Sequence, residues 1–214
     1  MKTILLISAL VIGLIQCVLG QYDPKAREVL DAMSNKYQSI PSFKASITHT
    51  LENQQENLNE EFSGDITVKG DMYRLDMGGQ EVINNGVTLW TYLEDVNEVN
   101  IADYDPEDEE LSPSKIYDLY KTGYKYTLIG ESPNQGDSYD IVDLIPEDKD
   151  NQFIKIRMVI SKKEHTLKSW KMFDKTGNVY TYQITDFNPN LEISDSFFVF
   201  DASAYEGVEV IDFR

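Results

Sequence analysis

Residues 64–93 read GDITVKGDMYRLDMGGQEVINNGVTLWTYL. Apolar and polar residues alternate along much of this stretch, and a period of two is typical of a β-strand with one buried face. Gly78-Gly79 and Asn85-Gly86 interrupt the alternation, and such pairs accept the positive φ that tight hairpin turns need. The stretch therefore predicts consecutive antiparallel strands, which we extend to residues 60–101.

The same period continues outward in both directions. Residues 43–51 place apolar side chains at the odd-numbered positions, with His49 among them, and the polar run 52–59 then predicts a solvated loop. The composition of residues 175–178 is that of a turn. The period predicts a strand from residue 43, one strand and an extended tail within 197–214, and strands at 124–130, 139–145, 153–161, 167–173 and 179–187.

Two short helices are expected beside these strands. Asp23-Pro24 resembles an N-cap followed by proline at the first helical position, and the apolar residues that follow have helical spacing, which predicts a helix over 24–38. Ser112-Pro113 begins a second helix with a short apolar stripe, and Gly123 lies where a helix ends.

About ten strands and two helices indicate a single α+β domain built on one large antiparallel sheet. Residues 89–93 and 141–145 are apolar at both odd and even positions, so both faces of these strands are expected to be partly removed from water. Two short helices can cover only part of one face. Either side chains of a curved sheet or an apolar ligand must cover the rest.

The N-terminus predicts export. Lys2 precedes the apolar run Ile4–Ile15, which is too short to span a bilayer and resembles a secretory signal peptide over residues 1–20, cleaved after Gly20. The mature domain, 21–214, then has no cysteine, which excludes disulfides, thiolate catalysis and cysteine-based zinc sites. Lipidation of Cys17, which would tether the protein, stays open as an alternative.

The chain is strongly acidic. It has 37 Asp and Glu against 19 Lys and Arg, a formal charge of −18, and loss of Lys2 with the signal takes this to about −19. Nucleic acid is excluded as a partner, because binding to phosphates requires basic patches. Anionic membranes should also repel the protein, apart from any local basic patch.

The sequence contains none of the usual catalytic signatures, such as G-x-S-x-G, H-E-x-x-H, a P-loop or G-x-G-x-x-G. His49 is either a polar group inside a cavity or, more simply, a hydrogen-bonded structural histidine, and His165 is expected in a solvated turn. The acidic segment 103–110 is expected to be an exposed loop, in which Pro106 and the absence of the required glycine argue against a calcium loop. We therefore expect no catalytic residue, metal or cofactor.

Five pieces of the sequence resemble the outer-membrane lipoprotein carrier family, the LolA-like periplasmic chaperones. Their order along the chain is that of the family, and the order helix, strands, helix, strands resembles the family over nearly the whole mature domain. These pieces are Gly64–Lys69, Tyr73–Leu75, Val82–Tyr92, Phe198–Phe200 and Gly207–Asp212.

The resemblance implies an incomplete, unclosed antiparallel β-barrel whose concave apolar face is lidded by short helices and holds the acyl chains of lipoproteins. It also implies a non-enzymatic periplasmic carrier, expected to be a monomer. An ABC-type transporter of the inner membrane would load the carrier with acylated lipoproteins, and an outer-membrane acceptor would unload it.

One departure from the family concerns the lid. Many members carry an Arg-Pro pair after the lysine that matches Lys69, and that arginine is thought to hold the lid, whereas Gly70 and Asp71 follow here. The resemblance therefore does not supply the lid contact, and Lys69 or Arg74 is the candidate replacement at a polar rim.

The candidate acyl-binding residues come from the two helices and from the apolar positions of the early strands. Residues of this kind are also ordinary core residues, and periodicity does not distinguish a filled interior from a cavity. The candidates are Met33, Phe43, Ile47, Ile66, Val68, Tyr73, Leu75, Trp90, Ile116 and Leu119.

Two other functions stay open at this point. A periplasmic sensor of lipids, or another protein that binds hydrophobic ligands, would have the same fold. An exported acid hydrolase would instead require carboxylates with perturbed pKa values facing a cleft.

Overall fold

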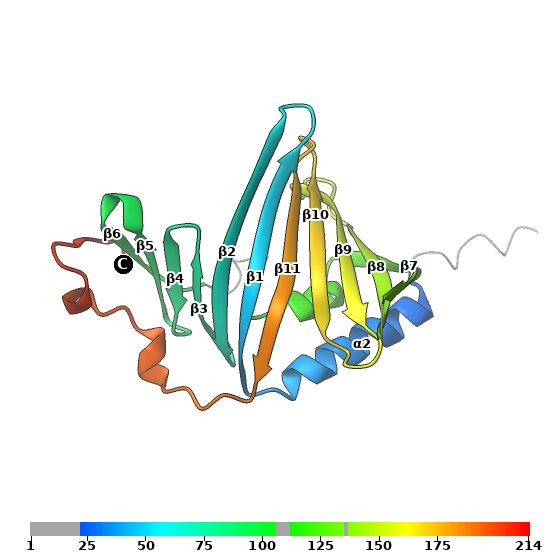
Figure 1. The fold of residues 1–214 in the computed structure, drawn as a ribbon, viewed down its shortest axis with the longest axis horizontal. Coiled ribbons are helices and arrows are strands. Elements are labelled where there is room, and N and C mark those ends of the chain that lie inside the picture. Colours follow the sequence, from blue (N-terminus) through cyan, green and yellow to red (C-terminus); the bar gives the residue numbers. More distant parts are fainter. Residues whose placement is uncertain (1–21, 106–111, 135–136) are drawn as a thin grey trace, which may run out of the picture.

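The computed structural model describes residues 22–105, 112–134 and 137–214 (Figure 1). The expected signal peptide and most of the acidic loop 103–110 lie outside these residues. Within the described ranges, no helix is both long enough and apolar enough to cross a membrane.

The described residues form one twelve-stranded sheet in the order β12-β6-β5-β4-β3-β2-β1-β11-β10-β9-β8-β7. The expected strands are present, and the hairpin turns at Gly78-Gly79 and Gly86 have the positive φ that their glycines allow. The strands are β1 (Ser42–Asn53), β2 (Leu58–Lys69), β3 (Met72–Met77), β4 (Gln80–Asn84), β5 (Thr88–Leu93), β6 (Glu98–Asp103), β7 (Tyr124–Asn134), β8 (Asp137–Pro146), β9 (Phe153–Ser161), β10 (Leu167–Asp174), β11 (Val179–Pro189) and β12 (Glu209–Asp212).

The sheet is open, because the strands at its two edges, β7 and β12, are not hydrogen-bonded to each other. Neighbouring strands are antiparallel except β12, which pairs with β6 in parallel. The two halves of the sheet meet where β1 pairs with β11, from Phe43 opposite Pro189 to Glu52 opposite Val179. An unclosed, mainly antiparallel barrel-like sheet is therefore confirmed, with one parallel pair that the sequence did not predict.

Helix α2 (Pro24–Gln38) has the predicted bounds. The Asp23 side chain accepts hydrogen bonds from the backbone N–H groups of Lys25 and Ala26, and proline begins the first turn, so the N-terminus is capped as its sequence indicates. Ala26, Leu30, Met33 and Tyr37 are buried on one side of the helix and pack on the sheet. The face on which they pack is called the inner face below, and the opposite face the outer face.

The second helix is shorter than expected. Only the 3₁₀ helix η3 (Ile116–Lys121) forms after Ser112, and Gly123 follows with a φ of 76°. So few residues lie between Pro113 and Gly123 that the unfavourable nucleation of an α-helix is not offset by added turns. Three further 3₁₀ turns are η2 (Glu94–Val96), η4 (Asp195–Phe198) and η5 (Ala202–Ala204).

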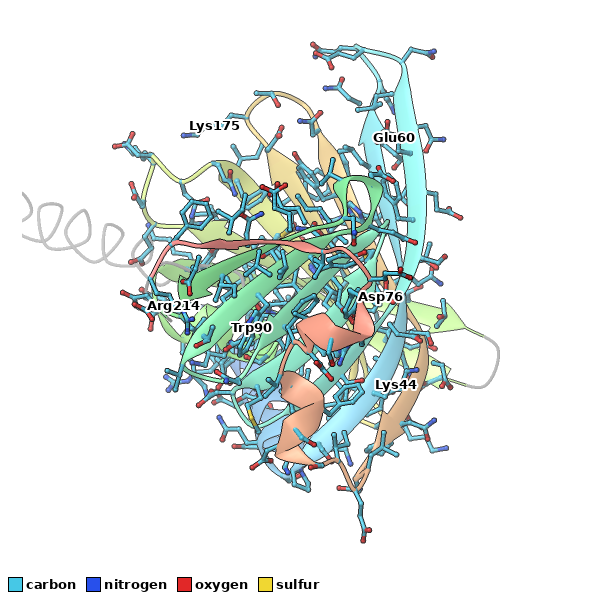
Figure 2. All side chains as sticks on the ribbon, turned by 90° about the vertical axis from the view of Figure 1, so that its left-hand side faces the viewer. Lys44, Glu60, Asp76, Trp90, Lys175 and Arg214 are labelled. Carbon is cyan, nitrogen blue, oxygen red and sulfur yellow. The ribbon has the colours of Figure 1, made fainter. Side chains whose placement is uncertain are left out.

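The sheet has a core on each side. The main core lies on the inner face, beneath α2 and η3. A smaller core lies on the outer face of β3–β6, where the C-terminal segment 190–208 crosses the sheet and buries Phe198 and Phe200 against Ile83 and Val99. Figure 2 shows this segment lying over the strands that carry Trp90.

The two cores cover both faces of residues 89–93 but only one face of residues 141–145. In β5, Leu89 packs on the inner core, and Trp90 and Tyr92 pack on the outer one, as expected. In β8, Val142 and Leu144 are buried on the inner face, but Ile145 is 42% exposed on the other. The outer face of 141–145 is therefore partly removed from water, as expected, with Asp143 only 7% exposed and Ile145 the most exposed of the stretch.

Candidate functional site

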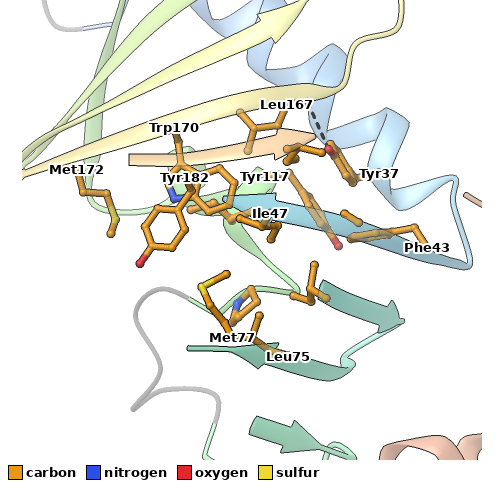
Figure 3. Close-up of a pocket in the computed structure, with 15 residues that line it drawn as sticks. Tyr37, Phe43, Ile47, Leu75, Met77, Tyr117, Leu167, Trp170, Met172 and Tyr182 are labelled. Carbon is orange, nitrogen blue, oxygen red and sulfur yellow. Dashed lines mark hydrogen bonds between the residues drawn. The ribbon is translucent and has the colours of Figure 1, made fainter. Parts of the chain in front are cut away.

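A cavity of about 220 Å³ lies between the inner face of the sheet and the elements that cover it (Figure 3). Its walls come from β1, β2, β3, β10 and β11, from the C-terminal end of α2 and from the segment just before and within η3. The lining residues are Tyr37, Phe43, Ala45, Ile47, Ile66, Leu75, Met77, Pro113, Ile116, Tyr117, Leu167, Trp170, Met172, Tyr182 and Ile184.

The strand register brings this lining together. Ala45 lies opposite Ile66 on β2 and opposite Phe187 on β11, so alternate residues of three neighbouring strands point to the same side. Ile47 lies opposite Gly64, where an added Cβ would overlap the carbonyl oxygen of Asp76. The glycine thus allows β2 and β3 to approach closely beside the cavity.

The cavity wall is apolar apart from phenol hydroxyls and the indole nitrogen. The ring of Tyr37 stacks on that of Tyr117 with centroids 4.8 Å apart, and its hydroxyl accepts a hydrogen bond from the backbone N–H of Leu167 at 3.3 Å. Burial raises the pKa values of Tyr37, Tyr117 and Tyr182, so these phenols stay neutral. Among the described residues that line the cavity there is no carboxylate, amine or imidazole.

The cover of the cavity is held together by hydrogen bonds between α2 and η3. Asp118 Oδ1 accepts from Ser34 Oγ at 2.5 Å, and Asp118 Oδ2 accepts from Gln38 Nε2 at 3.1 Å. The Tyr120 hydroxyl donates to Asp31 Oδ1 at 2.5 Å. Two carboxylates, one on each element, thus join the helix to the 3₁₀ turn.

These contacts also set the ionisation of Asp118. Partial burial opposes its charge, but hydrogen bonds from Lys121, Ser34 and Gln38 outweigh that effect and hold the pKa of Asp118 below its ordinary value. Burial, followed by the hydrogen bond to Asp31, raises the pKa of Tyr120. At neutral pH the ionised Asp118 therefore accepts from neutral donors on α2, and the neutral hydroxyl of Tyr120 donates to Asp31.

Half of the candidate acyl-binding residues line the cavity, namely Phe43, Ile47, Ile66, Leu75 and Ile116. Met33, Val68 and Tyr73 are buried in the adjoining core, with exposed fractions of 0%, 3% and 1%. Leu119 is half-buried against the same core and borders a separate surface hollow beside η3.

Trp90 is placed on the other side of the sheet. It packs against the outer core, beneath the C-terminal segment, rather than against the cavity. Both the odd-numbered and the even-numbered positions of β5 carry apolar side chains, so alternation alone did not show which positions face inward.

Lys69 and Arg74 also point to the outer face. Lys69 Nζ donates to the carbonyl oxygen of Ile193 at 2.7 Å and pairs with Asp195 at 2.6 Å. Arg74 pairs with Glu81 at 2.7 Å, donates to the carbonyl oxygen of Phe197 at 3.1 Å and lies over the Phe197 ring. Their contacts hold the C-terminal segment, so the expectation that they form a lid contact at the cavity is corrected.

The sequence reasoning missed the part of the wall that comes from the second half of the chain. Trp170, Met172, Tyr182 and Ile184 reach the cavity because β10 and β11 join the sheet next to β1. Their alternation was visible, but their position beside β1 depends on a pairing between segments far apart in the sequence.

His49 lies on the inner face beyond the cavity, in a row of aromatic rings. It stacks on Tyr182 with centroids 4.4 Å apart, and Tyr182 stacks on Trp170 at 4.8 Å. Its Nε2 is buried and has no hydrogen-bond partner among the described residues, and burial lowers the pKa of His49. The structural interpretation of His49 is therefore only partly right, because stacking rather than a bond to Nε2 holds the ring.

No group of three or more His, Cys, Asp or Glu side chains within the described ranges has the arrangement of a metal site. Only Asp103, Tyr104 and Asp105 of the acidic segment belong to the part of the chain that the structure covers. The remainder of that segment lies outside it.

Solved structures with similar folds cover most of the chain. An uncharacterized conserved protein from Thermus thermophilus is 13% identical, with a TM-score of 0.60 over 88% of this chain and 99% of that one. The lipoprotein LppX of Mycobacterium tuberculosis is 11% identical, with a TM-score of 0.51 over 80% of this chain and 100% of that one. These likenesses establish a shared fold.

A LolA superfamily protein from Nitrosomonas europaea is 12% identical, with a TM-score of 0.46 over 82% of this chain and 98% of that one. A search of curated proteins found no match. The family model for the outer membrane lipoprotein carrier protein LolA matches residues 38–201, a range that includes every strand of the cavity wall. The chain therefore belongs to the LolA family of outer membrane lipoprotein carrier proteins.

Proposed function

We propose that the protein is a periplasmic carrier that binds the acyl chains of lipoproteins released from the inner membrane and delivers them to the outer membrane. The observation that carries the proposal is the cavity of about 220 Å³ on the inner face, whose wall holds no charged side chain among the described residues. Membership of the LolA family supports the same function.

The energetics of acyl chains explain why such a cavity is useful. Each methylene withdrawn from water contributes about 0.8 kcal/mol, so a lipoprotein with long acyl chains needs an apolar shelter to stay in solution. Pockets for drug-sized ligands measure about 300–1,000 Å³, and the cavity here is smaller. It can accommodate part of one chain as it stands, and α2 and η3 must move away from the sheet to admit more.

The pKa values of several carboxyl groups favour a binding function over a hydrolytic one. A general acid needs a carboxyl group with a raised pKa, whereas the surroundings of Asp65, Asp118 and Asp174 lower the pKa values of these carboxyl groups. Hydrogen bonds from neighbouring side chains, away from the cavity wall, account for the low values. We therefore propose a binding role without catalysis or a cofactor.

The proposed partners are acylated lipoproteins, an inner-membrane ABC-type transporter that loads the carrier, and an outer-membrane acceptor. A monomer suffices for this role, because the cavity is built within one chain. The second candidate is an acyl sensor with the same cavity, which would bind acyl probes equally well but would not move lipoproteins between membranes.

The test is release of a labelled outer-membrane lipoprotein from cognate spheroplasts by the purified mature protein. Ile184→Trp should fill the cavity and reduce release, because Ile184 lies in its wall. Gln183→Trp on the neighbouring, exposed position of β11 introduces the same side chain outside the cavity and should leave release unchanged. Acyl binding without release of lipoprotein would contradict the carrier function and favour the acyl sensor. Absence of both acyl binding and release would exclude the cavity as the binding site.

A further inference from the structure

The outer face of the sheet changes character between its centre and the β8–β10 region. At the centre, the outward positions of β1 and β11 are polar, as in Thr48 opposite Gln183 and Thr50 opposite Thr181. This is the usual composition of a sheet face that meets water. The outward positions of β8–β10 depart from it in both charge and hydrophobicity.

The register identifies which residues share this outward face. Asp143 on β8 lies opposite Arg157 on β9, and Arg157 lies opposite Lys171 on β10. Along β8, Asp143 alternates with Val142 and Leu144, which are buried on the inner face. The neighbouring positions complete a patch, called the outer patch below, that consists of Lys125, Ile145, Lys155, Arg157, Lys171 and Phe173.

The outer patch is basic on an acidic protein. It has four cations around one carboxylate, that of Asp143, whereas the whole chain has 37 acidic residues against 19 basic ones. Arg157 donates to both oxygens of Asp143, at 2.6 and 2.8 Å. Lys155 Nζ is 3.9 Å from Asp143 and lies 4.3 Å from the centroid of the Phe173 ring. One carboxylate cannot neutralise all four cations, so a positive excess remains.

The acidic groups at the margin of the outer patch have partners of their own. Asp174 accepts hydrogen bonds from Thr176 and Asn178 within its turn, and Glu147 accepts one from the Tyr22 hydroxyl. Asp148 and Asp150 lie in the loop between β8 and β9, which also contains Lys149 and is joined to Lys175 by a hydrogen bond. The margin therefore carries four carboxylates against Lys149 and Lys175, a net charge of −2, and these groups lie outside the outward strand positions that form the outer patch.

Exposed apolar side chains accompany the cations. Ile145 is 42% exposed between Lys125 and the end of β8, and Ile154, at the bulge beside Lys155, is 53% exposed. Lysine and arginine stems bury their methylenes along apolar surface and keep the charge at the polar boundary. A surface that alternates cations with exposed isoleucines therefore suits the headgroup region of a membrane, where the isoleucines leave water and the cations stay at the polar boundary.

We propose that the outer patch rests on the surface of an anionic lipid bilayer. This goes beyond acyl binding, because the outer patch lies on the opposite face of the sheet from the cavity wall. Contact through it leaves α2, η3 and the cavity, which lie on the inner face, turned away from the lipid, where a protein partner can reach them. Acidic surface elsewhere, beyond a Debye length of about 8 Å at physiological salt, is largely screened from the bilayer.

The expected strength of the attraction between the outer patch and an anionic bilayer suits a transient contact. An anionic surface strengthens the binding of each nearby lysine or arginine about fivefold, and here one of the four charges is offset by Asp143. Attraction of this size is weak and reversible, and it should fall steeply as salt is added.

The test is cosedimentation of the full mature protein with vesicles of phosphatidylcholine containing phosphatidylglycerol, against pure phosphatidylcholine. The triple variant Lys125→Gln, Lys155→Gln, Lys171→Gln should lose affinity on the order of a hundredfold at low salt. Lys25→Gln, Lys36→Gln, Lys163→Gln makes the same change in net charge at exposed positions elsewhere and should bind like the unaltered protein. If the triple variant fails to fold, Lys171→Glu alone, at an exposed position, should lower affinity more than about fivefold.

Equal losses in the two triple variants would overturn the proposal, because net charge rather than the outer patch would then control binding. Absence of any preference for the anionic vesicles would also overturn it, and an acidic protein surface would become the class that the outer patch fits. Titration of each variant with an acyl probe should be unchanged. A failure of membrane contact is therefore distinguishable from a failure of the cavity.

Discussion

The carboxylate of Asp118 on η3 accepts a hydrogen bond from the hydroxyl of Ser34 on α2, with 2.5 Å between Oδ1 and Oγ. Ser34 is 1% exposed, so this contact lies inside the junction between the two elements that cover the cavity. Any movement that enlarges the cavity by separating α2 from η3 must break it.

Ser34→Ala should therefore loosen the cover. Loss of a hydrogen bond to a charged group costs about 1.5–3 kcal/mol of unfolding free energy, and the lower end is expected here because Gln38 and Lys121 keep Asp118 from being left unpaired. Chemical denaturation measures the stability, and the association rate of a fluorescent fatty acid measures the opening. Ser39→Ala removes an exposed hydroxyl that bonds the Lys36 carbonyl and should change both much less. An association rate that does not rise in Ser34→Ala would show that the cover opens elsewhere.

The stabilising effect of Asp118 should depend on pH in the acid range. Because its folded pKa is lowered, its contribution is fully present above the ordinary pKa near 3.8 and is lost as the pH falls through the folded value. The stability difference between the unaltered protein and Asp118→Asn should be constant from pH 7 to 5 and shrink below pH 4. A difference that already shrinks above pH 5 would contradict this assignment.

His49 should make the protein less stable on mild acidification. Burial lowers its pKa, so the unfolded chain binds the proton more readily, and stability declines as the pH falls below the ordinary value of 6.5. His49→Phe keeps an aromatic ring in the stack with Tyr182 and removes the titrating group. Thermal unfolding at pH 7.5 and 5 should show a smaller decline for the variant, and an equal decline in both proteins would exclude His49 as the cause.

Arg74→Ala should release the C-terminal segment from the outer face. The arginine joins Glu81 to the Phe197 carbonyl, and Glu81 also accepts from the Tyr205 hydroxyl at 2.7 Å. Removal leaves a largely buried carboxylate without its cation, and because the pair is partly exposed the cost should lie between about 1 kcal/mol for a surface pair and about 3–5 kcal/mol for a fully buried one. Limited proteolysis should then cleave near residues 190–208 while acyl binding is retained.

Lys44→Ala is the matched control, because Lys44 pairs with Asp65 at 2.8 Å with both side chains about half exposed. Its effect on stability should stay below about 1 kcal/mol. Loss of acyl binding in Arg74→Ala, with the fold intact, would instead restore a role for Arg74 at the cavity.

Gly64→Ala should destabilise the sheet beside the cavity. The added Cβ would overlap the backbone of Asp76 and Met77, and such overpacking costs about 1–3 kcal/mol. Gly130→Ala is the control, because its Cβ would meet nothing within 4 Å and its φ is not positive. Equal unfolding midpoints for the two variants would show that β2 and β3 can separate without cost.

Local pattern was sufficient for most of the elements, although the second predicted helix forms only as the 3₁₀ helix η3. The Asp23-Pro24 cap predicted α2 with its observed bounds, and the glycine turns at Gly78-Gly79 and Asn85-Gly86 predicted the hairpins of β3, β4 and β5. These features depend on a few neighbouring residues and on the backbone angles that those residues allow. The family resemblance then led to an open sheet with a covered apolar face.

The tertiary structure alone decided which apolar positions form the cavity. The pairing of β1 with β11 joins residues such as Phe43 and Pro189, and it is this pairing that brings Trp170 and Tyr182 to the wall. Alternation shows that neighbouring side chains point to opposite faces, but a distant segment determines which face is buried. For Trp90 the distant segment is the C-terminal one, which covers it on the outer face. Lys69 and Arg74 point to the same face and hold this segment through hydrogen bonds.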